Sequence, residues 1–145
     1  MRARVEGGEL CVEVEAAFHA DPPPPAPPGP TDRLWEHEVV ELFLLGEGER
    51  YLEIELGPHG HHLVLCLGGR RRVERRGMAI EYAARRAGGR WSGRALVPAA
   101  WLPRGLARCN AYAAHGAGAA RRHLAAFPIP GPEPDFHRLE RFGPW

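Results

Sequence analysis

The sequence predicts an all-β sandwich that forms a single domain over residues 1–145. Short segments alternate apolar and polar side chains, which is the pattern of half-buried strands. Glycine-rich turns separate these segments about every eight to twelve residues, as in sandwich folds. No segment carries a long repeat of 3.6 residues. A chain of 145 residues is long enough for one domain with a substantial core.

The chain is expected to begin with a hairpin. Residues 3–6 and 10–18 flank Gly7-Gly8, and a Gly-Gly pair readily adopts the positive φ values of a two-residue turn. In the second strand the apolar side chains share one face, whereas Glu13 and Glu15 share the other. This pattern indicates a strand that is buried on one side only.

The rest of the chain repeats this organisation. Two strands within residues 38–56 and a third at residues 63–67 form a predicted meander, with a turn at residues 57–60. Gly88-Gly89 predicts a second two-residue hairpin turn. The other predicted elements are strands at residues 80–86, 91–97, 109–115 and 123–129 and one helical turn at residues 98–102.

Two segments of biased composition are expected to be loops. Residues 22–30 hold seven prolines in nine positions, which favours a stiff, extended polyproline II conformation. A rigid loop that crosses from one sheet to the other is expected there, and a docking segment for a protein partner is the alternative. Residues 68–77 contain five arginines without a helical face, which predicts a solvated loop.

The composition limits the partners and the compartment. The net charge of +1 gives no long-range electrostatic reason to expect a nucleic acid or an anionic membrane as a partner. The N-terminus has no apolar signal segment, so a cytoplasmic location is expected. Cys11, Cys66 and Cys109 lie in apolar runs without metal-site spacing, so we expect buried free thiols. The sequence does not determine the oligomeric state.

The stretch EVVELFLLGEGERYLEIEL, residues 38–56, places glutamates between apolar side chains of a predicted hairpin. For the apolar side chains of both strands to face one core, the numbers of paired residues must add to an even sum such as 94 or 96. With 96, Glu41 lies opposite Glu55 and Phe43 opposite Glu53; with 94, Glu41 lies opposite Glu53. A loop of three or five residues is required, and either register places two carboxyl groups side by side.

Opposed carboxylates on one sheet face need compensation. Their Cβ atoms are about 4.5 to 5.5 Å apart, and like charges at that spacing are destabilising. An arginine such as Arg94, a bound cation or the hydroxyl groups of a sugar could each supply it. A glycosidase pair is less favoured, because carboxyl groups on one hairpin point the same way instead of flanking a bond from two sides.

Histidines and aromatic residues offer further polar and stacking groups. His59, His61 and His62 crowd one turn, but three histidines so close in sequence seldom point to one metal ion. His115 and His137 are each isolated, and no serine or cysteine lies in a nucleophile-elbow motif. Trp35 directly precedes a polar cluster, which makes it a candidate platform for a ligand.

The stretches LWEHEVVELFL, YLEIELGPHGHHLVL, RWSGRALVP, NAYAAHG and PDFHRLERFGPW follow one another from residue 34 to the C-terminus. Together they resemble an uncharacterised protein family with a DOMON-like domain, related in fold to the family 9 carbohydrate-binding modules. The resemblance implies a jelly-roll-like sandwich of two antiparallel sheets. Relatives in the wider superfamily bind sugars through tryptophans and acidic or amide groups on one face, sometimes with structural calcium.

The resemblance also implies site residues. Other DOMON domains bind haem through Met and His, but this chain has only Met1 and Met78, so no haem is expected. No catalytic residue, metal ligand or cofactor is expected, although the resemblance allows a structural calcium ion. The expected ligand-binding residues are Trp35, Glu38, Glu41, Tyr51, Glu53, Glu55, His62, Arg94, His115 and His137.

These observations favour a non-enzymatic binding module for a carbohydrate or another polyhydroxylated small molecule. The glutamate face and Trp35 carry this interpretation, together with the family resemblance. A small hydrolase or lyase that uses a Glu/His pair is one alternative. A structural interaction domain that docks partners through its proline segment is another.

Overall fold

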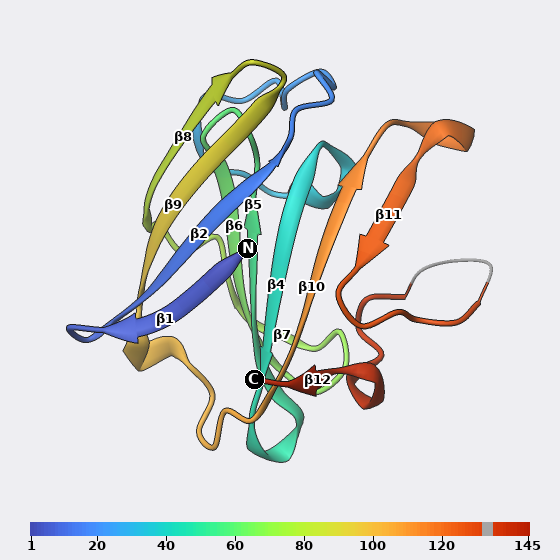
Figure 1. The fold of residues 1–145 in the computed structure, drawn as a ribbon. Coiled ribbons are helices and arrows are strands. Elements are labelled where there is room, and N and C mark those ends of the chain that lie inside the picture. Colours follow the sequence, from blue (N-terminus) through green and yellow to red (C-terminus); the bar gives the residue numbers. More distant parts are fainter. Residues whose placement is uncertain (132–134) are drawn as a thin grey trace.

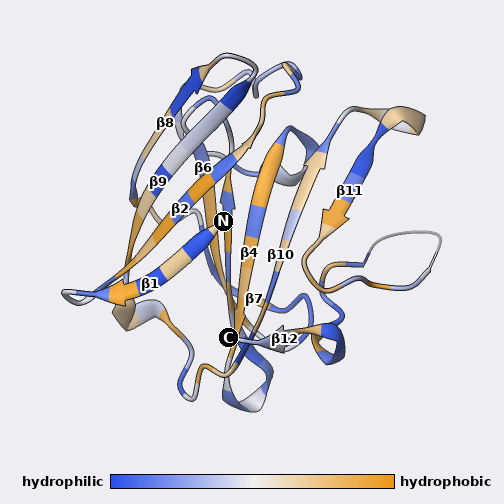
Figure 2. Cartoon of the chain, in the orientation of Figure 1, coloured by the Kyte–Doolittle hydropathy of each residue, from blue (hydrophilic) through white to orange (hydrophobic). Residues whose placement is uncertain are grey.

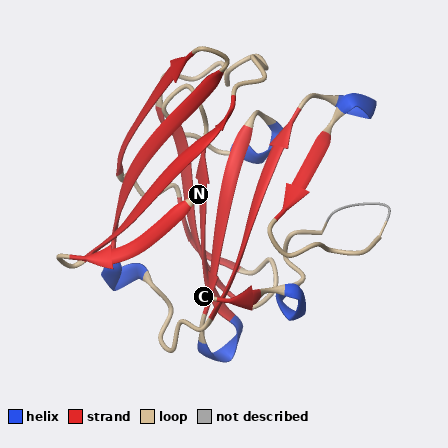
Figure 3. Ribbon diagram, in the orientation of Figure 1, coloured by secondary structure: helices blue, strands red, loops and turns tan. Residues whose placement is uncertain are grey.

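The computed structural model of the chain describes residues 1–131 and 135–145, which fold into two β-sheets (Figures 1 and 3). The strands are β1 (Arg2–Glu6), β2 (Glu9–Ala17), β3 (Gly29–Pro30), β4 (Val39–Leu45), β5 (Arg50–Leu56), β6 (His61–Gly68), β7 (Val73–Arg76), β8 (Glu81–Ala87), β9 (Arg90–Pro98), β10 (Arg108–His115), β11 (Arg122–Ala125) and β12 (Gly143–Pro144). Short 3-10 turns are η1 (Leu34–Glu36), η2 (Glu47–Glu49), η3 (Ala99–Trp101), η4 (Gly118–Ala120) and η5 (Leu139–Arg141).

The smaller sheet has the strand order β1-β2-β9-β8, and the larger sheet has the order β11-β10-β4-β5-β6-β3. In addition, β12 pairs with β10 and β7 pairs with β6. All pairings are antiparallel except the two-residue pairing of β3 with β6. The predicted sandwich of two antiparallel sheets is therefore confirmed, with this short parallel pairing as an addition.

The two glycine pairs form the expected hairpin turns. Gly7 and Gly8 have φ values of 59° and 84°, and Gly88 and Gly89 have values of 57° and 73°. Two successive positive φ values match the twist of the flanking strands, and glycine adopts them without steric cost. The pairs connect β1 to β2 and β8 to β9.

The register of β4 and β5 is one of the two that parity allows. Glu41 pairs with Glu55 and Phe43 with Glu53, which is the sum of 96. Leu45 pairs with Tyr51, which leaves a five-residue loop between them. The prediction that parity places two carboxyl groups side by side is confirmed.

The first core lies between the two sheets. Alternate residues of β4 and β5 pack there against β2 and β9, and Figure 2 shows β2 and β4 as largely hydrophobic. The fully or nearly fully buried members are Leu10, Val12, Val14, Val40, Leu42, Leu44, Leu52, Ile54, Leu56, Val64, Trp91, Ala95 and Val97. This core contains the even-numbered apolar residues of β4 and β5.

A second core covers the opposite face of the larger sheet. Its strand residues include Phe43, Tyr51 and Leu65, and the C-terminal segment adds Leu139 and Phe142. That segment, red in Figure 1, returns alongside β10, where β12 pairs. Both faces of the larger sheet are thus buried, and Glu41, Glu53 and Glu55 belong to the second face.

The structure confirms the expected course of the proline segment but differs from the expectations for the arginine segment and for two of the three cysteines. The proline segment does cross from the smaller sheet to the larger one, from β2 to β3. The arginine segment is not wholly a loop, because Val73–Arg76 pairs with β6 as strand β7. All three cysteines are free, but only Cys11 is buried; Cys66 and Cys109 are partly exposed, since they lie near sheet margins.

Asn110 of β10 attaches the chain beyond β11 to the larger sheet. Its Nδ2 atom donates hydrogen bonds to the Phe127 carbonyl at 2.9 Å and to the Tyr112 hydroxyl at 2.8 Å. Its Oδ1 atom accepts from the backbone N–H groups of Phe127 and Ala111 at 3.0 and 2.9 Å. Tyr112 in turn donates to the Phe136 carbonyl at 3.2 Å.

Replacing Asn110 with Ala should lower the free energy of unfolding by about 2 to 3 kcal/mol, because buried backbone groups lose their partners. Urea denaturation checks this value. Ser92→Ala, on the exposed face of β9, is the control and should change stability by no more than about 0.5 kcal/mol. Equal effects of the two changes would contradict the assigned role of Asn110.

Candidate functional site

A pocket of about 400 Å³ opens onto the second face of the larger sheet. Buried residues of β4, β5 and β6 form its floor, and residues of the surrounding loops and of β7, β11 and the C-terminal segment form its walls. The lining residues are Asp32, Trp35, Glu41, Glu53, Leu65, Leu67, Arg71, Val73, Arg76, His123, Phe136 and His137. Four of the predicted site residues therefore meet here: Trp35, Glu41, Glu53 and His137.

Three buried glutamates lie at or beneath the floor of this pocket. The exposed fractions of Glu41, Glu53 and Glu55 are 2%, 3% and 0%. Glu41 Oε1, Glu53 Oε2 and both carboxyl oxygens of Glu55 are buried and receive no hydrogen bond from the described residues. Buried polar groups are nearly always paired in folded proteins, so this group of orphaned oxygens is unusual.

Burial controls the charge of these carboxyl groups. It raises the pKa of Glu41 well above the usual range, to which Glu53 adds, while Arg121 partly opposes the rise. Burial likewise raises the pKa of Glu55 far above normal, with further contributions from Glu41 and Glu53. Burial raises the pKa of Glu53 to about 7. At neutral pH burial therefore favours the protonated form of Glu41 and Glu55 and leaves Glu53 partly ionised, which lowers the repulsion between the three groups.

His137 is neutral in this environment. Burial, and then the positive charge of Arg71, lower the pKa of His137 to about 4. Its Nδ1 atom lies 2.7 Å from the Tyr51 hydroxyl, which also accepts the Arg71 backbone N–H at 3.0 Å. The Tyr51 hydroxyl therefore donates to Nδ1, and the imidazole carries its proton on Nε2. Tyr51 supports the pocket from behind and is not part of its lining.

Arg121 fixes the part of the wall that contains Trp35. Its guanidinium donates to the backbone carbonyls of Trp35 at 2.5 Å, His37 at 2.9 Å and Gly116 at 2.9 Å. The Trp35 side chain is 41% exposed, although the turn that carries it is attached on several sides. Trp35 thus presents a large aromatic surface at a defined place.

Phe136 supplies a second aromatic wall. It stacks on Tyr112 with ring centroids 3.9 Å apart and an interplanar angle of 10°. The His123 ring contacts its edge at a centroid distance of 5.6 Å. The wall is held by the packing of the C-terminal segment on β10 and β11.

Four other predicted site residues lie away from the pocket. Glu38 accepts the backbone N–H groups of His19 and Asp21 at 3.0 and 3.3 Å and so fixes the start of the proline segment. The His115 ring stacks on His19 at 3.5 Å. His62 Nε2 accepts the Ile80 N–H at 3.4 Å, on the face of β6 that points to the first core.

Arg94 is the fourth of these residues. It lies opposite Glu13, between β2 and β8 in the smaller sheet. The suggestion that Arg94 compensates the opposed glutamates is therefore wrong. Parity within a hairpin does not determine which sheet a distant strand joins, and β9 belongs to the other sheet. The glutamates are instead compensated by protonation.

The histidines of the 57–62 turn do not converge. His59 contacts Arg86, His61 Nε2 bonds the Ala26 carbonyl at 2.9 Å, and His62 bonds Ile80. Within residues 1–131 and 135–145, no group of three or more His, Cys, Asp or Glu side chains is placed to hold a metal ion. The structural calcium ion that the resemblance allows stays a prediction.

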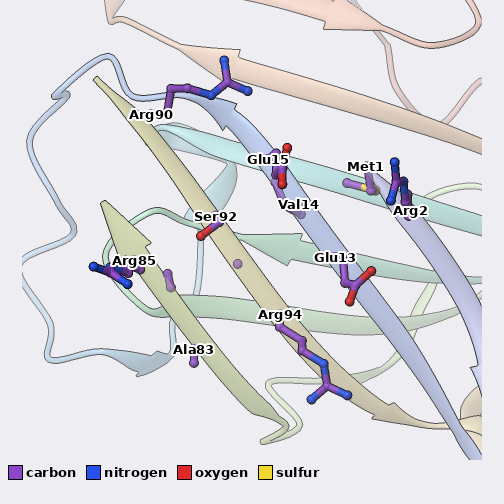
Figure 4. Close-up of a pocket in the computed structure, with 12 residues that line it drawn as sticks. Met1, Arg2, Glu13, Val14, Glu15, Ala83, Arg85, Arg90, Ser92 and Arg94 are labelled. Carbon is purple, nitrogen blue, oxygen red and sulfur yellow. The ribbon is translucent and has the colours of Figure 1, made fainter. Parts of the chain in front are cut away.

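A larger hollow of about 600 Å³ lies on the outer face of the smaller sheet (Figure 4). Arg85, Arg90 and Arg94 project around Ser92, with Glu13 and Glu15 beside them. These polar side chains are exposed or partly exposed, as on any solvated sheet face. The smaller pocket, with its buried and unpartnered carboxyl groups, is the better candidate site.

Several lining residues were not anticipated from the sequence. Asp32, Arg71, Arg76, His123 and Phe136 reach the pocket only through tertiary contacts. The arginine segment and the PDFHRLE stretch were recognised as features, but no local pattern related either one to the glutamate face. The site offers buried carboxyl groups, neutral imidazoles, two aromatic surfaces and two guanidinium groups at its mouth.

No protein-family model matches the chain. It is 44% identical over 145 residues to the UPF0462 protein C4orf33 homolog of Rattus norvegicus, covering 94% of this chain and 73% of that protein. Identity to the Danio rerio homolog is 42% over 153 residues, covering 98% of this chain and 78% of that protein. These matches do not confirm the DOMON-like relationship, which stays a prediction.

A solved structure has a similar fold. The crystal structure of a "putative carbohydrate-binding protein" from Bacteroides uniformis matches with a TM-score of 0.63 and 21% identity. The match covers 94% of this chain and 70% of that one. It supports the two-sheet fold. Among the described residues, no helix is long and apolar enough to cross a membrane.

The free energy of unfolding should fall as the pH rises from 6.5 to 8. A carboxyl group whose pKa is raised by folding holds its proton in the native state after the unfolded chain has released it, so its stabilising effect is lost with rising pH. Below about pH 6.5 the lowered pKa of His137 acts in the opposite direction, which sets the lower limit. Urea denaturation across this range measures the slope.

Glu55→Gln should raise stability at pH 8 and reduce this slope by up to about 1.4 kcal/mol per pH unit, the effect of one retained proton. Glu81→Gln, in the exposed edge strand β8, is the matched control and should leave the slope unchanged. Identical slopes in the wild type and the Glu55 variant would show that Glu55 is ionised in the fold.

Arg121→Gln should accelerate backbone hydrogen exchange in residues 34–38, because the carbonyls of Trp35, Glu36 and His37 lose their charged donor. A stability loss of about 1 to 2 kcal/mol should accompany it. Hydrogen–deuterium exchange with mass spectrometry checks the local effect. Arg122→Gln is the control, since Arg122 bonds only the nearby carbonyls of Ala119 and Arg121. Unchanged hydrogen exchange at residues 34–38 would contradict the role of Arg121 in fixing the turn that carries Trp35.

Proposed function

The chain belongs to the UPF0462 family, and from the geometry of its pocket we propose that it is a non-enzymatic binding module for a carbohydrate or another polyhydroxylated small molecule. The observation that carries the proposal is the pair of buried carboxyl groups, Glu41 and Glu53, in the pocket floor. Each has a buried oxygen without a hydrogen-bond partner among the described residues. Both residues also line the pocket, so ligand hydroxyl groups can bind the part of each carboxyl group that faces it.

Energetics support this assignment. Leaving a buried polar atom unpaired costs about 1 to 3 kcal/mol. A hydroxyl group can both donate and accept, so it suits a carboxyl group in either protonation state. A polyol that hydrogen-bonds to Glu41 and Glu53 therefore offsets part of the free-energy cost of burying them, whichever of them holds the proton.

The walls suit a sugar ring. Aromatic side chains pack against the apolar C–H faces of sugars, while polar groups bind the ring's hydroxyls. Trp35 offers such a surface, with Phe136 as a second. The volume of about 400 Å³ lies within the range of roughly 300 to 1,000 Å³ that is common for small-molecule sites.

The structural neighbour points the same way. The protein from Bacteroides uniformis bears the name of a "putative carbohydrate-binding protein" and shares the fold over 94% of this chain. At 21% identity this likeness carries no residue-level argument. It adds support to a proposal that rests on the pocket.

A hydrolase or lyase using a Glu/His pair is less well supported. Glu53 Oε2 lies 4.0 Å from His137 Nδ1, but that nitrogen already accepts from Tyr51. Glu41 and Glu53 lie on one sheet face, whereas glycoside hydrolysis needs carboxyl groups on both sides of the bond. The described lining residues include no Ser, Thr, Cys or Lys.

Isothermal titration calorimetry with a panel of mono- and disaccharides, sugar acids and sugar phosphates tests the proposal. At least one member should bind, and Trp35→Ala should weaken that binding about tenfold or more, because the stacking surface is lost. Trp145→Ala is the matched control: Trp145 is exposed to a similar degree but lies outside the pocket. No binding by any member at millimolar concentration would refute the proposed function.

A further inference from the structure

Two arginines stand on one wall of the pocket. Arg71 lies in the turn between β6 and β7, and Arg76 ends β7. Both line the pocket and both are exposed. A neutral sugar can be held by the carboxyl floor and the aromatic walls alone, so these two guanidinium groups are not explained by the binding of a plain polyol.

The backbone of Arg71 is held in an uncommon conformation. Its φ is 58°, in the left-handed region that residues with side chains seldom adopt. The Arg71 N–H donates to the buried Tyr51 hydroxyl, which His137 fixes from the other side. Such conformations persist where surrounding structure maintains them, and they concentrate at ligand-binding sites. The turn therefore fixes the backbone from which the Arg71 side chain extends to the pocket mouth.

The charges at the mouth favour an anion. Arg71 pairs with Asp135 at 3.1 Å, and Arg76 lies 3.6 Å from Asp32. The Arg76–Asp32 pair is exposed on both sides, and such pairs contribute only about 0 to 1 kcal/mol, so an incoming anion can replace it. Asp135 is less exposed and also pairs with Arg70, but the Arg71 side chain itself is exposed, so an anion can share this guanidinium group. Of these two aspartates only Asp32 lines the pocket. At the pocket mouth the two guanidinium groups of Arg71 and Arg76 thus face one exposed carboxylate, that of Asp32.

The floor opposes an anion only weakly. Burial raises the pKa of Glu41 well above its usual range and lowers the pKa of His137 to about 4, which favours the neutral form of both groups. Glu53, with a pKa of about 7, is partly ionised at neutral pH, so part of one negative charge remains in the floor against the two guanidinium groups at the mouth. The planar guanidinium group matches the oxygens of carboxylate, sulfate and phosphate in pairs.

From this arrangement we propose that the ligand is an anionic sugar or a similar polyol acid, whose carboxylate, sulfate or phosphate group binds Arg71 and Arg76 while its hydroxyls reach Glu41 and Glu53. This inference rests on the proposed function, because it places the polyol part of the ligand in the same pocket. It narrows the ligand to a compound with a hydroxylated ring and one negative substituent.

Calorimetry with matched pairs tests the inference: glucose against glucuronate and glucose 6-phosphate, and galactose against galacturonate. At least one anionic member should bind about tenfold or more tightly than its neutral counterpart at low ionic strength. Arg71→Gln and Arg76→Gln should each remove most of that preference. Arg72→Gln is the control, because Arg72 belongs to the same turn but does not line the pocket. Thermal melting confirms that each variant folds.

The outcomes separate the two proposals. Neutral and anionic sugars that bind equally, with no effect of Arg71→Gln or Arg76→Gln, would overturn the anionic preference and leave the proposed function standing. Binding of anions that Arg72→Gln weakens as much as the other two variants would also overturn it, since a diffuse basic patch would then be responsible. No binding by any sugar would refute both.

Discussion

The register between β4 and β5 is the constraint on which the rest of the structure depends. Both apolar sets of this hairpin must face the first core, so the intervening positions face the other side of the sheet together. On that side Glu41 meets Glu55, and Glu53 meets Phe43. Three carboxyl groups are thereby gathered where a second core would otherwise be wholly apolar.

Most of this second face of the larger sheet is covered, and one opening, the pocket, is left. Asn110 and Tyr112 hold the returning C-terminal segment, whose Leu139 and Phe142 complete the second core. Glu55 is fully buried and does not line the pocket, whereas Glu41 and Glu53 reach it. Protonation lowers the repulsion among the carboxyl groups, but Glu41 Oε1 still receives no hydrogen bond from the described residues. A protein optimised only for stability has little reason to retain such a group, so a binding role explains it better.

Sequence reasoning succeeded where the physical rule was local. Parity predicted two opposed carboxyl groups within one hairpin in either of two registers, of which the pairing of Glu41 with Glu55 is observed. Gly7-Gly8 predicted a turn through its backbone freedom. It failed where the outcome depended on distant packing. Arg94 has the residue type needed to compensate a carboxylate, but β9 joins the other sheet.

The same limit applies to the individual site residues. Glu38 shares a sequence pattern with Glu41, yet it binds the backbone at His19 and Asp21 and does not reach the pocket. Arg71 and Phe136 line the pocket, although no sequence pattern around either residue relates it to the glutamates. The sequence could therefore identify Glu41 and Glu53 in the floor and Trp35 and His137 around it, but not the other side chains that line the pocket.

Burial raises the pKa of Glu41 and Glu55 well above the usual range, so both should be protonated at neutral pH. Carbon-13 NMR of the glutamate side-chain carboxyl carbons, followed from pH 5 to 8, measures this most directly. Two resonances, assigned through Glu41→Gln and Glu55→Gln, should keep the chemical shift of a protonated carboxyl group at pH 7. Resonances of Glu41 and Glu55 that already have the chemical shift of an ionised carboxylate at pH 6, as an exposed glutamate does, would contradict this.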